Sequence, residues 1–310
     1  MDDDLFDAVV GDGRPLLVLT ALVLVGAGAF VSFQAGTGHF LPHDTAYLGM
    51  TASELCLLQG CRILYFMIHD RISFGGVLIA TGLMYLWLAL VPLRRKESWA
   101  WWALAASGSA GFLSFLAYLG YGYLDTWHGA ATLVLLPIFL SGMVRTRALR
   151  AGPHPTGRTA AGRRRIGRTL LLASTFGITM GGLTIMAVGM TRVFVPQDLD
   201  FMGVSARDLQ EVNPRLVPLI AHDRAGFGGA LVSCGIAMFL SVLHAAPSRS
   251  LWQVLLVSGL AGFGTAVGVH PAIGYTTVSH LGPAVLGACV FATGLALTVP
   301  AVPTRATAGS

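Results

Sequence analysis

The sequence has little charge. Only 11% of its 310 residues are Asp, Glu, Lys or Arg, whereas 54% are hydrophobic. Soluble domains carry about 25% charged residues, so this shortage argues against a large soluble core. The arginines that are present cluster between apolar runs, and the positive-inside rule explains such clusters without a nucleic-acid partner. The composition therefore predicts a polytopic membrane protein, with the lipid bilayer as its partner and no nucleic acid.

The N-terminus lacks the features of a secretory signal peptide. It begins Met1-Asp2-Asp3-Asp4, with neither a basic n-region nor a small-residue cleavage site. We therefore expect the first apolar run to stay in the protein.

Apolar runs long enough to cross a membrane recur along the whole chain. A spanning helix needs about 20 mostly apolar residues. By that measure we predict an all-α fold with eight transmembrane helices. The runs cover residues 15–33, 72–92, 99–121, 126–144, 169–193, 227–244, 251–269 and 278–299.

Basic residues fall in alternate loops between these runs. They occur at residues 94–96, throughout 145–168, at Arg249 and at Arg305. With eight spans, all of these loops lie on one side of the membrane, which the positive-inside rule makes cytoplasmic. We therefore expect a multi-pass protein of the plasma membrane with both termini in the cytoplasm.

A short phrase occurs twice in the chain. His-Asp-Arg-Ile-Ser-Phe-Gly-Gly at 69–76 returns as His-Asp-Arg-Ala-Gly-Phe-Gly-Gly at 222–229. A tandem duplication is the simplest explanation. Each phrase ends in a Gly-Gly pair, which lets either a flat cofactor or another helix approach the backbone closely. We predict two four-helix halves at 1–146 and 169–310, a basic cytoplasmic linker at 147–168, and equivalent outer loops at 34–68 and 196–221.

Four histidines occupy equivalent places in the two copies, at the outer ends of the even-numbered helices. Helices two and four of one half can face each other across a bundle, and two facing imidazoles are what axial haem ligation requires. The alternative is a set of hydrogen-bonded histidines at the membrane interface. We favour ligands because all four positions match; they are His69, His128, His222 and His280.

This architecture resembles the heme A synthase family. In sequence the resemblance is confined to residues 68–71, 128–130 and 280–282. It implies a haem-binding membrane oxidoreductase or electron-transfer protein, with b-type or related haem and with an electron donor or haem-pathway proteins as partners. Arginine grips carboxylates in bidentate fashion, so a haem propionate is a possible partner for Arg71 and Arg224. The resemblance implies the axial pairs His69/His128 and His222/His280.

The chain also departs from this family. The family's glutamate, one turn before the helix-two histidine, is replaced by Phe66, and acidic residues instead follow the histidines at Asp70 and Asp223. The family often has a cysteine pair in its first outer loop. Here Cys56 and Cys61 lie in that loop, where an oxidising compartment permits a disulfide. We therefore expect a divergent relative rather than heme A synthase itself.

The repeated aspartates have three possible roles. Asp70 and Asp223 could support a histidine of another helix, form ion pairs with the adjacent Arg71 and Arg224, or cap the following helix. Their repetition makes them candidates for catalysis as well. The catalytic candidates are Asp70, Asp223, His43 and Asp44.

A metal site in the outer loops is a further possibility. Imidazole and carboxylate groups suit zinc, iron or manganese. No tight motif such as His-Glu-x-x-His is present. The residues that could form the site are His39, His43, Asp44, Glu54 and Asp70.

Two other functional classes stay open beside haem chemistry. A transporter or channel could use Asp70 and Asp223 as coupling groups, although no helix has a clear ionisable residue near the midplane. A non-catalytic membrane protein could bind a partner through its paired outer loops. His270 is either a substrate or proton group or a plain interfacial histidine.

Overall fold

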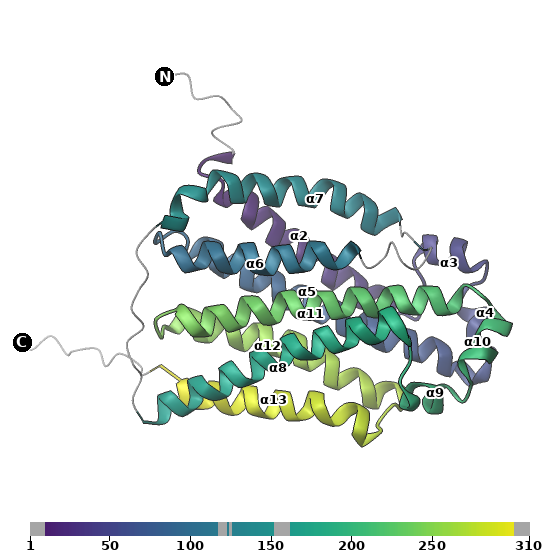
Figure 1. Cartoon of the computed structure of the whole chain (residues 1–310). Helices are drawn as coiled ribbons and strands as arrows, with labels where there is room; N and C mark the ends of the chain where they lie inside the picture. The colour runs from purple at the N-terminus through teal and green to yellow at the C-terminus, as the bar shows by residue number, and fades with distance from the viewer. Residues whose placement is uncertain (1–9, 117–122, 124–125, 152–161, 301–310) are drawn as a thin grey trace, which may run out of the picture.

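The fold is entirely helical over the part of the chain that the structure describes. A computed structural model describes residues 10–116, 123, 126–151 and 162–300 (Figure 1). These residues contain no strand, which confirms the all-α class. The elements are α2 (Arg14–Gly36), α3 (Pro42–Leu48), α4 (Ala52–Cys56), η1 (Gln59–Cys61), α5 (Arg62–Leu90), α6 (Ser98–Ser114), α7 (Thr126–Arg145), η3 (Arg147–Ala151), α8 (Arg163–Thr191), α9 (Pro196–Met202), α10 (Ala206–Val212), α11 (Leu216–His244), α12 (Arg249–Ile273) and α13 (Val278–Thr298).

Six of the described helices are long and apolar enough to cross a membrane. They are α2, α5, α8, α11, α12 and α13. The remaining two predicted spans correspond to α6, which has 17 residues, and α7, whose apolar part Gly129–Arg145 is short. The fold is thus that of a multi-pass membrane protein, and a count of eight spans stays a prediction.

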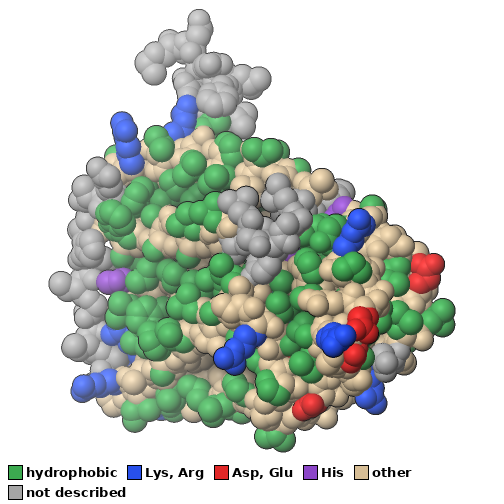
Figure 2. Space-filling view, turned by 45° about the vertical axis from the view of Figure 1, so that its right-hand side comes forward, with side chains coloured by type: hydrophobic (Ala, Val, Ile, Leu, Met, Phe, Trp, Pro, Cys, Tyr) green, Lys and Arg blue, Asp and Glu red, His purple; other side chains and the backbone are tan. Residues whose placement is uncertain are grey.

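The helices α5 and α11 form the centre of the bundle. In each of them 67% of the most apolar window is buried, against 17–22% for the other four long helices. The outer helices instead expose large apolar side chains such as Phe176, Leu260 and Leu286. Hydrophobic side chains spread over much of the face in Figure 2, while the acidic ones in view lie toward its right-hand side. An apolar outer surface of this kind is suited to lipid.

The two copies of the repeat interleave. The central helix α5 packs along α2 of its own copy and along α12 of the second copy. Equivalently, α11 packs along α8 of its own copy and along α6 of the first. The third helix of each copy therefore covers the central helix of the other. The predicted halves at 1–146 and 169–310 share one bundle rather than packing as two separate ones.

Glycine allows the central helices to pack closely against their neighbours. A Cβ on Gly75 of α5 would lie 2.7 Å from the carbonyl oxygen of Gly28 in α2. A Cβ on Gly228 of α11 would lie 2.7 Å from the carbonyl oxygen of Gly182 in α8. These contacts occupy equivalent places in the two copies. Close helix packing therefore explains why glycine recurs at these positions.

The predicted outer loops contain short helices. α4 begins with a capping box, in which the Glu54 amide donates to Thr51 Oγ1 at 3.2 Å and the Thr51 amide donates to Glu54 at 2.7 Å. The amide and the hydroxyl of Thr51 both donate to the carboxylate of Glu54, and these two hydrogen bonds lower the pKa of Glu54. α10 begins in the same way with Ser205 and Asp208. The four short helices α3, α4, α9 and α10 lie together at one end of the bundle, which we call the short-helix end (Figure 1).

The central helices begin earlier than the apolar runs predict. α5 starts at Arg62 rather than at residue 72, and α11 starts at Leu216 rather than at residue 227. A disulfide between Cys56 and Cys61 joins the end of α4 to the start of α5. The repeated His-Asp-Arg phrases therefore lie inside helices and not at their ends. Helix capping as the role of the repeated aspartates is wrong for this reason.

Two adjacent glycines of α8 test the close packing against α11. We expect Gly182→Ala to destabilise the fold by about 1–3 kcal/mol, because the new methyl group would meet the α11 backbone. Gly181 has open space at its Cβ position. Gly181→Ala should be neutral or stabilising by up to about 1 kcal/mol, since alanine is the better helix former. Thermal unfolding in detergent measures both, and equal effects would contradict the proposed packing.

Candidate functional site

Two buried networks of charge lie beside the central helices. In the first, Arg224 Nε lies 3.2 Å from Asp70 Oδ2, and Arg224 Nη1 lies 2.7 Å from Asp198 Oδ2. Arg224 also donates to the carbonyl oxygen of Val193 at 2.7 Å and lies over the ring of Phe66. All three charged side chains are buried. A buried arginine held on all sides in this way is fixed in both position and charge.

The second network repeats the first with the copies exchanged. Arg71 Nε lies 2.9 Å from Asp223 Oδ2, and Arg71 Nη1 lies 2.7 Å from Asp44 Oδ2. Each arginine thus bridges an aspartate of its own outer segment and the His-Asp aspartate of the other copy. The ion pairs predicted between adjacent residues, Asp70 with Arg71 and Asp223 with Arg224, are wrong. Adjacent side chains of a helix point in different directions, so each arginine reaches across instead.

A buried tyrosine completes each network. The hydroxyl of Tyr275 donates to Asp198 Oδ1 at 2.8 Å, and the hydroxyl of Tyr123 donates to Asp44 Oδ1 at 3.0 Å. Burial, and after it the charge of Asp198, raises the pKa of Tyr275. Tyr275 therefore stays a neutral phenol that donates a hydrogen bond.

Three histidines converge beside the first network. They are His69 of α5, His270 of α12 and His280 of α13, and we call them the three-histidine centre. Their ring centroids are 4.5 Å apart for His69 and His270, 5.4 Å for His69 and His280, and 5.3 Å for His270 and His280. One nitrogen of each ring lies within 4.8 Å of those of the other two. His69 and His270 are buried, and His280 is half-buried.

The surroundings of each ring restrict how it can act. Nδ1 of His270 faces the carbonyl oxygen of Ala266 at 2.7 Å, while its buried Nε2 has no hydrogen-bond partner among the described residues. In its neutral form, a ring that donates through Nδ1 keeps the Nε2 lone pair for another ligand. Nδ1 of His69 lies 3.1 Å from Asp70 Oδ1, without the alignment of a hydrogen bond.

His280 is held by the tyrosine of the first network. Its ring stacks on that of Tyr275, with centroids 4.2 Å apart and planes at 21°. Its Nδ1 lies 3.8 Å from Asp198 Oδ1, the oxygen that accepts the tyrosine hydroxyl. Asp198 therefore links the buried Arg224 to Tyr275, on which the ring of His280 stacks.

The observed pairing of the histidines differs from the predicted one. His280 lies against His69 of the other copy rather than against His222. His222 is buried and lies 5.0 Å from Tyr123 between ring centroids. The side chain of His128 lies outside the described residues. The structure thus does not bring His222 together with His280, because the start of α13 places the ring of His280 against His69 of α5.

Other predicted site residues have different roles or positions. Arg71 and Arg224, expected at haem propionates, are each engaged by two aspartates. Asp44 is held by Arg71 and Tyr123, with His43 Nε2 3.3 Å from it. Glu54 is exposed and caps α4. His39 is exposed as well, so the structure does not gather the proposed outer-loop metal ligands.

Three members of this site were not predicted from the sequence. His270 was assigned to substrate binding or the interface because the first copy has no histidine at that place. Asp198 and Tyr275 could have been found, because Asp44 and Tyr123 occupy the equivalent positions of the first copy. A polar residue that recurs in both copies within an apolar chain is informative even without a motif around it.

Comparison with known proteins adds no assignment. No family model, no curated protein and no solved structure matches this chain. The resemblance to the heme A synthase family stays a prediction, and the function has to follow from the chemistry of the site.

Two nearby aspartates test the importance of the first network. We expect Asp198→Asn to destabilise the fold by about 3–5 kcal/mol, because it leaves the buried Arg224 with one carboxylate instead of two. Asp200 lies on the same short helix but is exposed. Asp200→Asn should change stability by less than about 0.5 kcal/mol. Unfolding in detergent measures both variants, and a small effect at Asp198 would show that the network is not structural.

Proposed function

We propose that the chain is a multi-pass membrane oxidoreductase or electron-transfer protein that binds a redox-active metal at its three-histidine centre. The observation that carries this proposal is the convergence of His69, His270 and His280, with one nitrogen of each within 4.8 Å of the others. Imidazole is a common ligand of iron, copper, nickel and zinc. Three imidazole rings at these distances interact only weakly with one another, whereas all three could coordinate one shared cation.

The charges around the centre also favour a cation. Two carboxylates, Asp70 and Asp198, face the single guanidinium of Arg224. Their formal charges sum to −1 beside the three rings. A bound divalent ion would offset this excess, and carboxylates near ligating histidines orient the rings and raise their basicity. The repeated aspartate thus has a role in support of the histidines.

The form of the metal follows from the third histidine. Axial ligation of haem uses two rings, here His69 and His280, contributed by different copies. His270 lies within ligand distance of both and favours a bare ion, because a macrocycle would need the space around this third ring. Three protein ligands leave an open position, as in many catalytic metal sites. We therefore place a bare ion first and the haem of the heme A synthase-like interpretation second.

The membrane arrangement gives this proposal a location. In the predicted orientation the short-helix end faces away from the cytoplasm, and both termini lie in the cytoplasm. An electron donor or acceptor would then approach the centre from the outer side. In the transporter alternative Asp70 and Asp223 would act as coupling groups, but each is paired with an arginine of the other copy, and this pairing argues against such a role.

Metal analysis and a visible spectrum of the purified protein test the proposal. After expression with iron, copper, zinc and haem, we expect about one transition-metal ion per chain. His69→Ala and His270→Ala should each lower occupancy at least about tenfold, by analogy with changes around other metal sites. His39→Ala, at an exposed position, should leave occupancy unchanged.

The spectrum separates the two forms of the metal. A Soret band that depends on His69 and His280 but not on His270 would favour haem over the bare ion. A well-folded protein that is colourless and free of metal under all of these conditions would sink both forms.

Asp70 and Asp223 occupy equivalent positions of the two copies, so the same substitution at each tests whether Asp70 supports metal binding. We expect Asp70→Asn to weaken metal binding about 10–100-fold, since this residue lies 3.1 Å from His69. Asp223→Asn makes the same change in the second network and should leave the metal affinity of the folded protein unchanged. Titration of the stripped protein with metal measures both, and equal losses would assign the effect to folding.

A further inference from the structure

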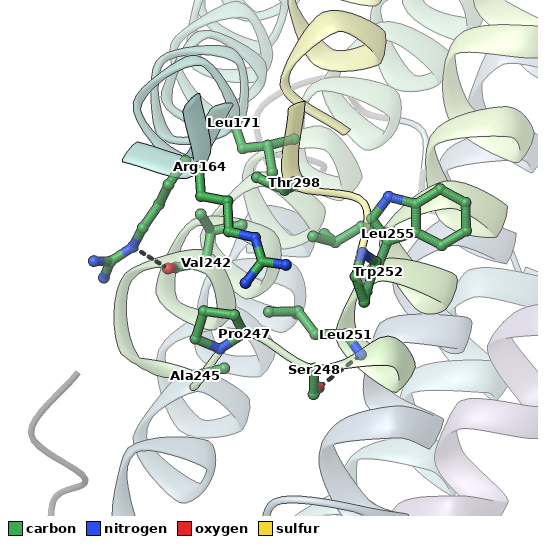
Figure 3. Close-up of a pocket in the computed structure, with 12 residues that line it drawn as sticks. Arg164, Leu171, Val242, Ala245, Pro247, Ser248, Leu251, Trp252, Leu255 and Thr298 are labelled. Atoms are coloured by element: carbon green, nitrogen blue, oxygen red, sulfur yellow. Dashed lines mark hydrogen bonds between the residues drawn. The ribbon is translucent and has the colours of Figure 1, made fainter. Parts of the chain in front are cut away.

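A cavity of about 290 Å³ lies between the ends of four helices, away from the three-histidine centre. It is lined by the start of α8, the end of α11, the start of α12 and the end of α13 (Figure 3). These helix ends belong to the arginine-rich end of the chain, opposite the short-helix end. The cavity is therefore independent of the proposed metal site.

The cavity carries positive charge. Arg164 and Arg168 both line it, and none of its lining residues among the described part of the chain is acidic. Arg168 is fixed, because it donates to the carbonyl oxygen of Val242 at 3.1 Å and to that of Leu243. The guanidinium of Arg164 is directed among the other lining side chains, between Val242 and Trp252 (Figure 3). No hydrogen bond or ion pair joins it to another described side chain.

A helix start adds to this positive potential. Ser248 lines the cavity and caps α12, accepting a hydrogen bond from the Leu251 amide at 3.2 Å. The amide groups at the start of a helix carry a partial positive charge. An anion beside Arg164 would therefore be attracted both by the guanidinium and by α12.

The inner part of the cavity is apolar. Leu171 lies seven residues beyond Arg164 in α8, which is about two turns further into the bundle. Leu251 and Leu255 of α12 face the same cavity, and all three leucines are buried. Trp252 is fixed by its indole N–H, which donates to the carbonyl oxygen of Leu295 at 3.0 Å. Tryptophan with an apolar ring and one polar contact is typical of a membrane interface.

We propose that this cavity binds an anionic phospholipid, with the phosphate beside Arg164 and Arg168 and the first part of an acyl chain against Leu171, Leu251 and Leu255. Charge at the helix start and hydrocarbon two turns deeper match the two parts of such a molecule. Inorganic phosphate would use only the charged part. A basic segment of protein would be repelled by the two arginines.

Lipid retention measured by native mass spectrometry tests this site. The probe is full-length protein reconstituted with equal amounts of phosphatidylglycerol and phosphatidylcholine. We expect the protein to retain phosphatidylglycerol about fivefold more than phosphatidylcholine, the preference that one basic residue near a membrane surface provides. Arg164→Gln should remove this preference, and Arg164→Glu should reverse it.

The neighbouring arginine is the matched control. Arg165 is exposed and does not line the cavity, so Arg165→Gln makes the same change in net charge and should alter retention less than about twofold. Thermal unfolding shows that each variant is folded. Equal retention of the two lipids by the unmodified protein, equal losses at both arginines, or full displacement of the lipid by millimolar inorganic phosphate would each overturn the proposal.

Discussion

The crosswise ion pairs hold the two copies of the repeat together. Arg71 and Arg224 each join an aspartate of one copy to an aspartate of the other. Removing one partner of a buried ion pair leaves an uncompensated charge. Burying a single charge costs far more free energy than burying the two charges as a pair. The interior of an apolar bundle contains no water that could solvate these charges. The two copies therefore cannot separate without a large penalty, and their interleaved packing follows from that constraint.

Among the described residues the same framework occurs twice, but the three-histidine centre occurs once. Both copies have an arginine between two aspartates and a tyrosine that donates to one of them. Only the second copy supplies a histidine at position 270. Since the framework is present with and without that histidine, the framework serves the fold, and His270 is what distinguishes one site from the other. Duplication followed by divergence at a few positions accounts for this asymmetry.

The sequence predicted the helical class and most of the long apolar helices, because both follow from local patterns of apolar residues. It failed at the starts of the two central helices, because an apolar-run criterion discards the turn that contains His69, Asp70 and Arg71. Those polar residues are buried by partners from distant parts of the chain. The pairing of His69 with His280 could not be predicted either, since a repeat shows which positions are equivalent but not which copy each one faces.

The two ion-pair networks and the three-histidine centre differ in how fully their polar groups are paired. Each arginine and aspartate of the two networks has close partners of opposite charge. His270 combines a hydrogen-bonded Nδ1 with a buried Nε2 that has no partner among the described residues. Leaving such an acceptor unpaired costs about 1–3 kcal/mol. A fold that satisfies its charges so fully would gain by filling this position with hydrophobic atoms, unless the nitrogen binds something. The unpaired nitrogen, beside two other imidazoles and an excess of negative charge, is the feature that supports the proposed cation.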